Sequence, residues 1–235
     1  MKPVLTMILT ASRPYFAPCA GYFRRADLAD LLVILDAVQF PRGTTWLTRN
    51  RFKNGQGTLW MTIPVHKKGL GLQPVQAVRI CWEGRWMHKL IESLRHAYKY
   101  APYLEEHLGA LLDGLGADSD RLIDLNLKLI GYLMQQLRVS TPLVRLSELG
   151  SDATGTARIV DICRRSGASI YLAQRSARSH LDAGLFEAAG IELRFVTPPS
   201  SVYPQLWGDF IPDLSAFDLL FNCGPKAGEI MRAFR

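Results

Sequence analysis

Two continuous apolar runs near the amino terminus constrain the fold more than any other feature of the sequence. Residues 4–9 and 31–35 each have the length and composition of a buried strand, and residues 19–28 between them suit a short helix. Strand, helix and strand in this order form a βαβ unit, and such units build parallel sheets. The sequence therefore predicts an α/β protein.

The rest of the chain extends this prediction. Apolar residues recur at helical spacing over residues 85–98, 103–112 and 120–137. Further strands are expected at 58–65, 75–82, 143–146, 169–173 and 191–196, with helices at 156–166 and 181–189. We predict a Rossmann-like, mostly parallel or mixed sheet in an α/β core over residues 1–84 and 139–235, interrupted by a helical insert or cap over 85–138.

Cysteine spacing and hydropathy bear on metal content and location. The four cysteines, at positions 19, 81, 163 and 223, form no Cys-x-x-Cys pair, so neither a zinc site nor a disulfide framework is expected. Lys2 and the apolar run 4–11 imitate a signal peptide, but Arg13 and Pro14 follow at once and a buried strand explains the run. No stretch approaches the roughly 18 apolar residues that span a bilayer. We expect a cytoplasmic protein without membrane insertion.

The positive charge is concentrated in one part of the chain. Lys and Arg number 28 against 21 Asp and Glu, a net charge of +7. Residues 13–99 hold 14 of the cations against 5 acidic residues, a local charge of +9. This excess coincides with residues 36–56, which lack a clear period and are predicted to form a long loop of the kind that often carries function. An anionic ligand is therefore expected at residues 40–53.

The residue types in this segment suit a phosphorylated ligand. Trp46 could stack on a base or sugar ring, while Arg49 and Arg51, with Asn50 between them, could hold a phosphate. The structural alternative is a buried tryptophan that anchors a solvated loop. Nucleic acid is also possible, but the chain carries no recognised RNA or DNA module, and a small phosphorylated ligand fits better.

Three residues are candidates for proton transfer. His88 is a general-base candidate because an unperturbed imidazole titrates near neutrality. Asp36 ends an apolar strand, and the carboxyl ends of strands are where α/β sheets bind ligands. Asp218 lies four residues before Asn222; in a helix both would share one face, and in a loop they could cap the neighbouring helix. The alternatives are an exposed or structurally satisfied histidine and a buried polar tie at Asp218.

Several short motifs occur in a fixed order along the chain. They are Arg13-Pro-Tyr-Phe-Ala-Pro-Cys-Ala-Gly-Tyr-Phe23, Asp36-Ala-Val-Gln-Phe40, Trp46-Leu-Thr-Arg-Asn-Arg51, Trp60-Met-Thr-Ile-Pro64, Trp86-Met-His-Lys89, Tyr98-Lys-Tyr-Ala-Pro-Tyr103, Tyr203-Pro-Gln205 and Leu214-Ser-Ala-Phe-Asp-Leu-Leu-Phe-Asn-Cys-Gly224. In content and order the chain resembles the WbqC-like family over nearly its whole length. The resemblance implies a role in the assembly of O-antigen, other glycans or specialised metabolites. Its motifs supply further substrate-binding candidates: Tyr22, Gln39, Lys89, Tyr203, Gln205 and Asn222.

The chain departs from the family pattern at several positions. Arg13 stands where the family commonly has Gln, Cys19 where Trp is usual and Thr48 where Asn is usual. A glycine-rich segment of the family corresponds here to Ala173-Gln-Arg-Ser-Ala-Arg178, which has no glycine for a backbone phosphate nest. Arg175 and Arg178 could substitute by charge, or the substrate could differ.

These observations lead to one main functional hypothesis and two alternatives. We expect a transferase that moves an acyl or aminoacyl group to an amino group of a nucleotide-linked sugar or a similar small molecule. Asp36 or His88 would take the amine proton, and the segment around Trp46 would hold the phosphorylated part. The alternatives are an ATP-using nucleotidyl-transfer-like enzyme or ligase, and a non-catalytic protein that binds a nucleotide or tRNA. The sequence indicates no particular cofactor or oligomeric state.

Overall fold

The structure, a computed structural model, describes residues 6–116, 119–197 and 202–233. The chain divides into two compact units. The first, here called the sheet unit, comprises Met1–Arg13, Arg24–Ala37 and Ser140–Pro198. The second, the hairpin unit, comprises Pro14–Phe23, Val38–Val139 and Pro199–Arg235, and it contains the three helices predicted for residues 85–138.

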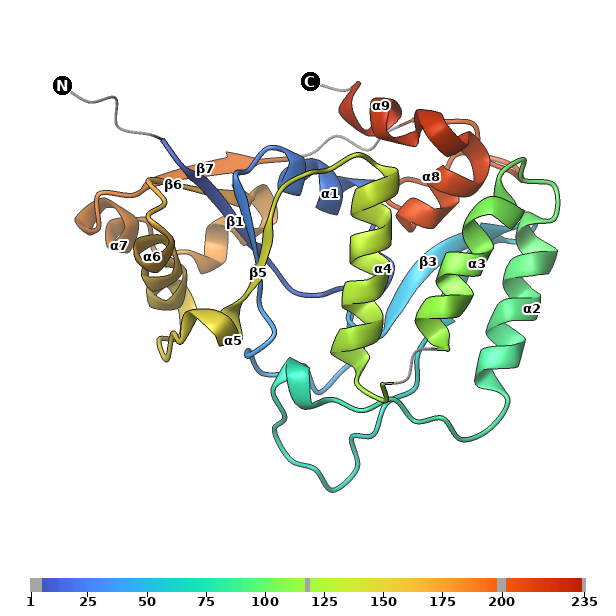
Figure 1. Cartoon of the computed structure of the whole chain (residues 1–235), viewed down its shortest axis with the longest axis horizontal. Coiled ribbons are helices and arrows are strands. Elements are labelled where there is room, and N and C mark those ends of the chain that lie inside the picture. Colours follow the sequence, from blue (N-terminus) through green and yellow to red (C-terminus); the bar gives the residue numbers. More distant parts are fainter. Residues whose placement is uncertain (1–5, 117–118, 198–201, 234–235) are drawn as a thin grey trace. The chain divides into compact units, whose positions relative to one another are not determined.

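The sheet unit is built on five parallel strands in the order β5-β2-β1-β6-β7 (Figure 1). The three central strands, β2, β1 and β6, are largely buried, as expected for a parallel sheet with helices on its faces, whereas the edge strands β5 and β7 are only partly buried. The prediction of an α/β fold with a parallel sheet is confirmed. The strands are β1 (Ile8–Ser12), β2 (Leu31–Ile34), β5 (Leu143–Arg145), β6 (Ile170–Gln174) and β7 (Glu192–Val196).

Helices connect these parallel strands. The predicted helices at 19–28, 156–166 and 181–189 are present, and the last two pack against each other. Gly167 ends the helix before β6 with a φ of 70°, a left-handed conformation that glycine adopts without strain. The helices are α1 (Ala20–Asp27), which enters the sheet unit at Arg24, α5 (Leu146–Leu149), α6 (Gly155–Ser166) and α7 (Ala183–Ala188), with a 3-10 turn at Arg175–His180.

The first strand lies further along the chain than its apolar run predicts. The prediction was residues 4–9, of which 4 and 5 lie outside the described residues, whereas β1 is Ile8–Ser12. The strand extends through buried Thr10 because its hydroxyl donates a 2.8 Å hydrogen bond to the carbonyl of Leu172. A buried polar group with a partner costs little, so the strand does not need a purely apolar sequence.

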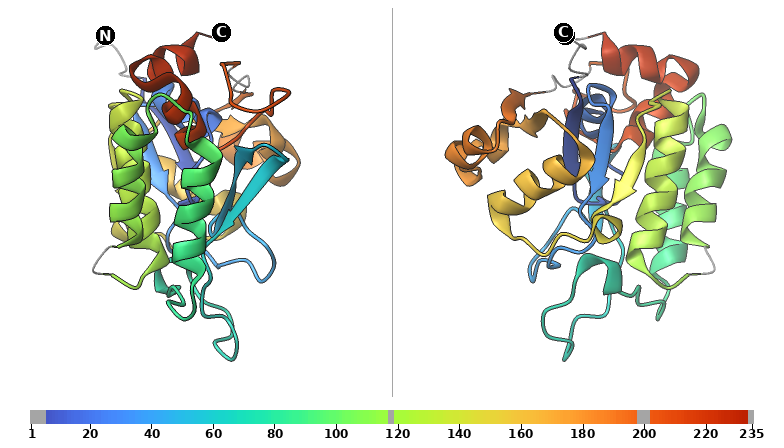
Figure 2. Two further views of the ribbon diagram at one scale, coloured as in Figure 1. Left: turned by 90° about the vertical axis from the view of Figure 1, so that its right-hand side faces the viewer. Right: turned by 60° about the vertical axis from the view of Figure 1, so that its left-hand side comes forward.

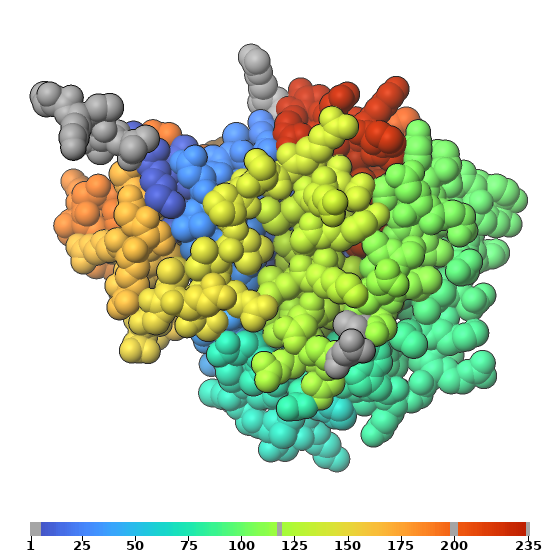
Figure 3. Space-filling view, in the orientation of Figure 1, coloured from blue at the N-terminus to red at the C-terminus, as the bar shows by residue number. Residues whose placement is uncertain are grey.

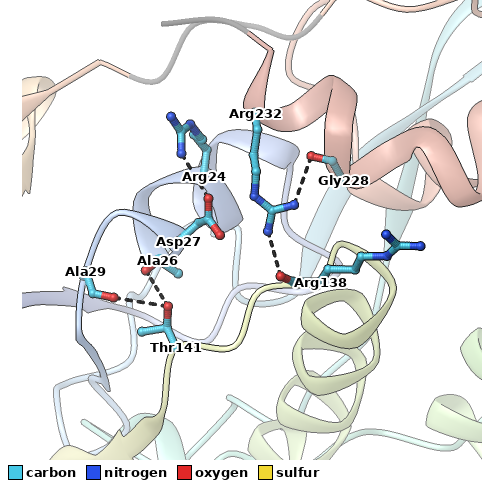
Figure 4. A network of polar contacts seen from close by, with 8 residues as sticks. All are labelled: Arg24, Ala26, Asp27, Ala29, Arg138, Thr141, Gly228 and Arg232. Atoms are coloured by element: carbon cyan, nitrogen blue, oxygen red, sulfur yellow. Dashed lines mark hydrogen bonds and ion pairs between the residues drawn. The ribbon is translucent and has the colours of Figure 1, made fainter.

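A threonine joins α1 to the segment that leads into β5. The Thr141 hydroxyl donates to the Ala26 carbonyl at 2.8 Å and lies 3.2 Å from that of Ala29 (Figure 4). Arg24 and Asp27 form an ion pair at 3.0 Å on the same helix. These contacts fix the end of α1 and therefore the entry to β2.

The hairpin unit combines an antiparallel β-hairpin with helices (Figure 2). The helices predicted over 85–98, 103–112 and 120–137 are confirmed with shifts of a few residues at their ends. The unit contains β3 (Arg49–Asn54), β4 (Gly57–Thr62), α2 (Trp86–Tyr98), α3 (Leu104–Leu115), α4 (Leu122–Gln136), α8 (Ala216–Cys223) and α9 (Ala227–Arg232), with 3-10 turns at Val75–Ala77 and Gly224–Lys226.

Two local predictions in this unit were wrong. The segment 36–56 is not a continuous loop, because β3 occupies its last part. Its strand pattern is concealed since a buried asparagine, Asn50, stands where an apolar residue would mark the inner face. Residues 75–82 form a short 3-10 turn and isolated bridges at Arg79 and Ile80 instead of a strand. These residues therefore make only isolated backbone bridges and do not pair with a neighbouring strand over several residues.

The core of the hairpin unit is apolar and aromatic. Leu125, Leu129 and Leu133 of α4 are fully buried, and α4 packs against α3 and α8. Side chains fill the space between the α3 and α4 ribbons, as Figure 3 shows. At the carboxyl end, Arg232 donates hydrogen bonds to the carbonyls of Arg138, at 2.7 Å, and Gly228 (Figure 4). These bonds attach α9 to the end of α4.

In the part of the chain that the structure describes, no helix has both the length and the apolar character needed to cross a bilayer.

Candidate functional site

The two strands of the hairpin sort their side chains onto two faces. Register pairs Arg49 with Thr62, Arg51 with Trp60, and Lys53 with Thr58. Because side chains alternate along a strand, these six residues share one face. The opposite face carries buried Asn50, Phe52 and Met61 and joins the core. The turn is closed by the Asn54 side chain, whose oxygen accepts the N–H of Gln56 at 2.9 Å.

An arginine and tryptophan cluster lies on the first of these faces. The Arg49 guanidinium carbon is 3.7 Å from the centre of the Trp60 ring. Trp60 and Trp46 lie 5.6 Å apart between ring centres, and Arg51 is 5.8 Å from the Trp46 ring. Both tryptophans are more than 40% exposed. We call these four residues, Trp46, Arg49, Arg51 and Trp60, the Arg-Trp surface.

The two arginines of this surface keep their positive charge uncompensated. Among the described residues, no carboxylate lies within 4 Å of either guanidinium. Arg51 is oriented by hydrogen bonds of 3.1 Å from Nη2 to the carbonyls of Pro212 and Asp213. A guanidinium that is held in place loses little freedom when an anion binds, so this geometry favours recognition of a phosphate or carboxylate.

Lys53 is on the same strand face but is buried. Its Nζ donates to the Gln205 side-chain oxygen at 3.1 Å and to the Asp209 carbonyl at 2.6 Å. Burial lowers the pKa of Lys53, and the charges of Asp218 and Asp209 oppose this shift. Lys53 was not among the site residues predicted from the sequence. The alternating positions of Arg49, Arg51 and Lys53 could have indicated that all three lie on one face of a strand.

Asp218 forms the centre of a buried hydrogen-bonded cluster. Its oxygens accept hydrogen bonds from the hydroxyls of Tyr98, at 2.6 Å, and Tyr203, at 2.7 Å. Asn222, one turn later on α8, donates to the Asp218 carbonyl at 2.7 Å. Burial raises the pKa of Asp218, and the two tyrosine hydrogen bonds lower it in part. The pKa of both tyrosines is raised by burial and by the adjacent carboxyl.

Tyr98 connects this cluster to the hairpin. Its hydroxyl accepts the backbone N–H of Lys53 at 2.8 Å while donating to Asp218. Gln205 also accepts the N–H of Ile211 at 2.9 Å, which ties residues 205–211 to the same network. Of the predicted site residues, the structure therefore brings together Asp218, Asn222, Tyr203 and Gln205. Tyr98 belongs to one of the motifs found in the sequence, but it was not among the predicted site residues.

The other two proton-transfer candidates lie in different surroundings. Asp36 is fully buried in the sheet unit, where its two oxygens accept the N–H and hydroxyl of Ser147 at 3.0 and 2.6 Å. His88 is exposed on α2 of the hairpin unit, as is the neighbouring Lys89. The His88 ring has no hydrogen-bond partner among the residues that the structure describes.

The structure also places the three remaining predicted site residues, Asn50, Tyr22 and Gln39. Asn50 donates to the carbonyls of Phe16 and Ala17 at 2.9 and 2.8 Å, so it holds the turn that follows β1. Tyr22 is buried with its ring against Phe23, and Gln39 is exposed in an isolated bridge. In the described ranges no three His, Cys, Asp or Glu side chains gather closely enough to hold a metal ion.

Fold and surface together define an α/β protein with a five-stranded parallel sheet and a basic, aromatic β-hairpin. The chain belongs to the WbqC-like protein family, whose family model matches residues 13–230. It is similar to the uncharacterized protein Rv1507c of Mycobacterium tuberculosis, with 31% identity over 223 residues, which cover 94% of this chain and 95% of that protein. No solved structure matches the chain.

Proposed function

We propose that this protein is a transferase of glycan or specialised-metabolite assembly that binds a nucleotide-linked sugar, or a similar phosphorylated small molecule, on the Arg-Trp surface. The acyl or aminoacyl group would pass from an ester or thioester donor to an amine of the acceptor, so that an amide bond forms, the donor's acyl–oxygen or acyl–sulfur bond breaks, and the alcohol or thiol leaves with the amine's proton. The observation that carries the proposal is the pair of exposed tryptophans, Trp46 and Trp60, flanked by Arg49 and Arg51 with no carboxylate partner among the described residues.

The chemistry of this surface suits both parts of such a ligand. Exposed tryptophan rings stack on a base or a sugar, and guanidinium groups bind the diphosphate through paired hydrogen bonds. The Arg49 guanidinium already lies over the Trp60 ring, so the ring and the charge are held together before a ligand arrives. Three residues of the hairpin face, Arg49, Arg51 and Trp60, and the adjacent Trp46 together form this recognition surface.

The proton-transfer role falls to His88 in this proposal. The oxygens of Asp36 and Asp218 are occupied by hydrogen bonds from Ser147 and from two tyrosines, respectively. His88 is the candidate whose ring is exposed. An exposed imidazole can reach an attacking amine and take its proton, whereas the two buried carboxylates are held in hydrogen bonds within the fold.

Binding is tested by following tryptophan fluorescence during titration with a panel of nucleotide sugars, ATP and tRNA. A nucleotide sugar is expected to quench the exposed tryptophans in the wild type. Arg49→Ala combined with Arg51→Ala should weaken binding at least tenfold, because two charge-assisted phosphate contacts are lost. Arg95→Ala removes an exposed arginine from α2 and serves as the control, with unchanged affinity. Equal affinity in the double variant and the control would contradict the proposal.

One observation favours a non-catalytic alternative. Two of the three proton-transfer candidates, Asp36 and Asp218, are buried and hydrogen-bonded, as in structural ties. A protein that presents a nucleotide or tRNA to a partner needs no general base. Binding of tRNA that weakens steeply with salt concentration, without binding of a nucleotide sugar, would support this alternative. A fluorescence change with ATP alone would support a ligase or nucleotidyl-transfer reaction.

A further inference from the structure

Within the described part of the chain, a buried arginine of the sheet unit has no carboxylate beside it. Arg25 of α1 is only 9% exposed, and its guanidinium donates a hydrogen bond to the hydroxyl of Ser12. Among the described residues no Asp or Glu carboxylate lies within 4 Å of it. A buried charge without an opposite charge is costly, so an anion that paired with this guanidinium would be favoured.

The position of Arg25 in the sheet supports this reading. Ser12 is the last residue of β1, and the neighbouring strand β6 ends at Gln174. After β1 the chain forms β2 and then β5 on one side of it, and it then crosses to the other side to form β6 and β7. The order of connection therefore reverses between β1 and β6, at the topological switch point. In open parallel sheets, ligands bind outside the carboxyl ends of the strands at this point.

The surrounding charges at this edge are positive. Arg13 directly follows Ser12, and Arg175 and Arg178 lie in the 3-10 turn that follows β6. Arg175 is exposed, and Arg178 lies 5.6 Å from the Phe195 ring at the end of β7. The carboxylate at this end of β2, Asp36, directs both oxygens to Ser147. Residues 175–178 thus contribute side-chain charge at this edge.

We infer that the carboxyl edge of β1 and β6 in the sheet unit is a phosphate-binding site, in which the guanidinium of Arg25 and the hydroxyl of Ser12 bind the phosphate group and Arg175 supplies additional charge. Guanidinium groups match phosphate oxygens in pairs, and a hydroxyl donates the third hydrogen bond. This site is separate from the Arg-Trp surface and does not rest on the proposed function. Its ligand would be inorganic phosphate or the phosphate of a small ester.

The test is calorimetric titration of the full chain with inorganic phosphate at constant ionic strength. We expect saturable binding by the wild type, at least tenfold weaker binding by Arg25→Met, and weaker binding by Arg175→Ala. Arg164→Ala is the matched control, since it removes an exposed arginine at the end of α6, and it should bind as the wild type does. Arg49→Ala should also leave binding unchanged, which separates this site from the hairpin.

Several results would overturn the inference. These are the absence of saturable binding in the wild type, wild-type affinity in both Arg25→Met and Arg175→Ala, and a loss of binding confined to Arg49→Ala. Because Arg175 is exposed, Arg175→Ala is expected to fold even if Arg25→Met does not. A phosphate ester is then distinguished from free phosphate by repeating the titration with glycerol phosphate.

Discussion

Among the residues that the structure describes, each of the two compact units buries one cationic side chain, and the surroundings of the two differ. In the hairpin unit, Lys53 has two oxygen acceptors, from Gln205 and Asp209, and the charges of Asp218 and Asp209 act on it. In the sheet unit, Arg25 has the hydroxyl of Ser12 and, among the residues that the structure describes, no carboxylate within 4 Å. Both are among the few buried charged residues of the described chain.

The difference separates a structural charge from a binding charge. The interactions of Lys53 are supplied by the folded chain itself, so they contribute to stability whether or not a ligand is present. The charge of Arg25 carries its desolvation cost without an ion pair to offset it. A phosphate bound beside Ser12 would supply the missing partner. The two positions therefore predict different responses to the same kind of substitution.

The largest expected effect is at Lys53. Replacement by methionine, which keeps most of the volume, should lower the free energy of unfolding by about 3 kcal/mol, because it leaves Gln205 and the Asp209 carbonyl with fewer partners and Asp218 without a nearby cation. Urea unfolding followed by circular dichroism measures this change. Lys68→Met removes an exposed lysine and is the control, with a change within about 0.5 kcal/mol. Equal effects at the two lysines would refute the structural role of Lys53.

An intermediate effect is expected at alkaline pH from Tyr171. Burial raises the pKa of Tyr171 to about 12, from 10.0, while the positive charge of Arg25 lowers it in part. Since the folded-state pKa is the higher one, the stabilisation is complete below pH 10 and is lost as the pH rises toward 12. The loss amounts to about 1.4 kcal/mol by pH 11.

Tyr171→Phe should remove this part of the alkaline loss. The measurement is the urea midpoint of wild type and variant between pH 8 and pH 11. The other buried tyrosines, including Tyr98, contribute to both proteins, so the difference between the two curves reports Tyr171 alone. Parallel curves over the whole range would mean that Tyr171 ionises as easily in the folded chain as in the unfolded one.

The smallest effect is expected at Arg25 itself. In buffer without phosphate, Arg25→Met should change the free energy of unfolding by less than about 1 kcal/mol, because the lost hydrogen bond to Ser12 is offset by removal of a buried charge without an ion pair. The same urea experiment serves. A destabilisation as large as that of Lys53→Met would show that Arg25 is a structural tie and would remove the contrast between the units.

The sheet unit could be predicted well from its sequence because its strands are short apolar runs and its helices have apolar stripes. The exception was β1, which continues through Thr10 since that hydroxyl finds a partner on β6. In the hairpin unit, β3 was missed because Asn50 occupies an inward position. Its side chain is satisfied by the carbonyls of Phe16 and Ala17, a contact that spans more than thirty residues and leaves no local pattern.

The same limit applies to the candidate site. The Arg-Trp surface was partly predicted, because Trp46, Arg49 and Arg51 are neighbours in the sequence. Trp60 was missed as a site residue, since only strand pairing brings it beside Arg51. The partners of Asp218 come from positions 98 and 203, and no spacing rule connects them to residue 218. Tertiary contacts of this kind are absent from local periodicity.

The contrast between Lys53 and Arg25 is tested most directly by the phosphate dependence of the free energy of unfolding at constant ionic strength. A ligand that binds only the folded state at ten times its Kd adds roughly 1.4 kcal/mol. The expected result is that phosphate stabilises the wild type and Lys53→Met by this amount but stabilises Arg25→Met by no more than about 0.4 kcal/mol, the value for tenfold weaker binding. Equal stabilisation of all three proteins, or of none, would contradict the account.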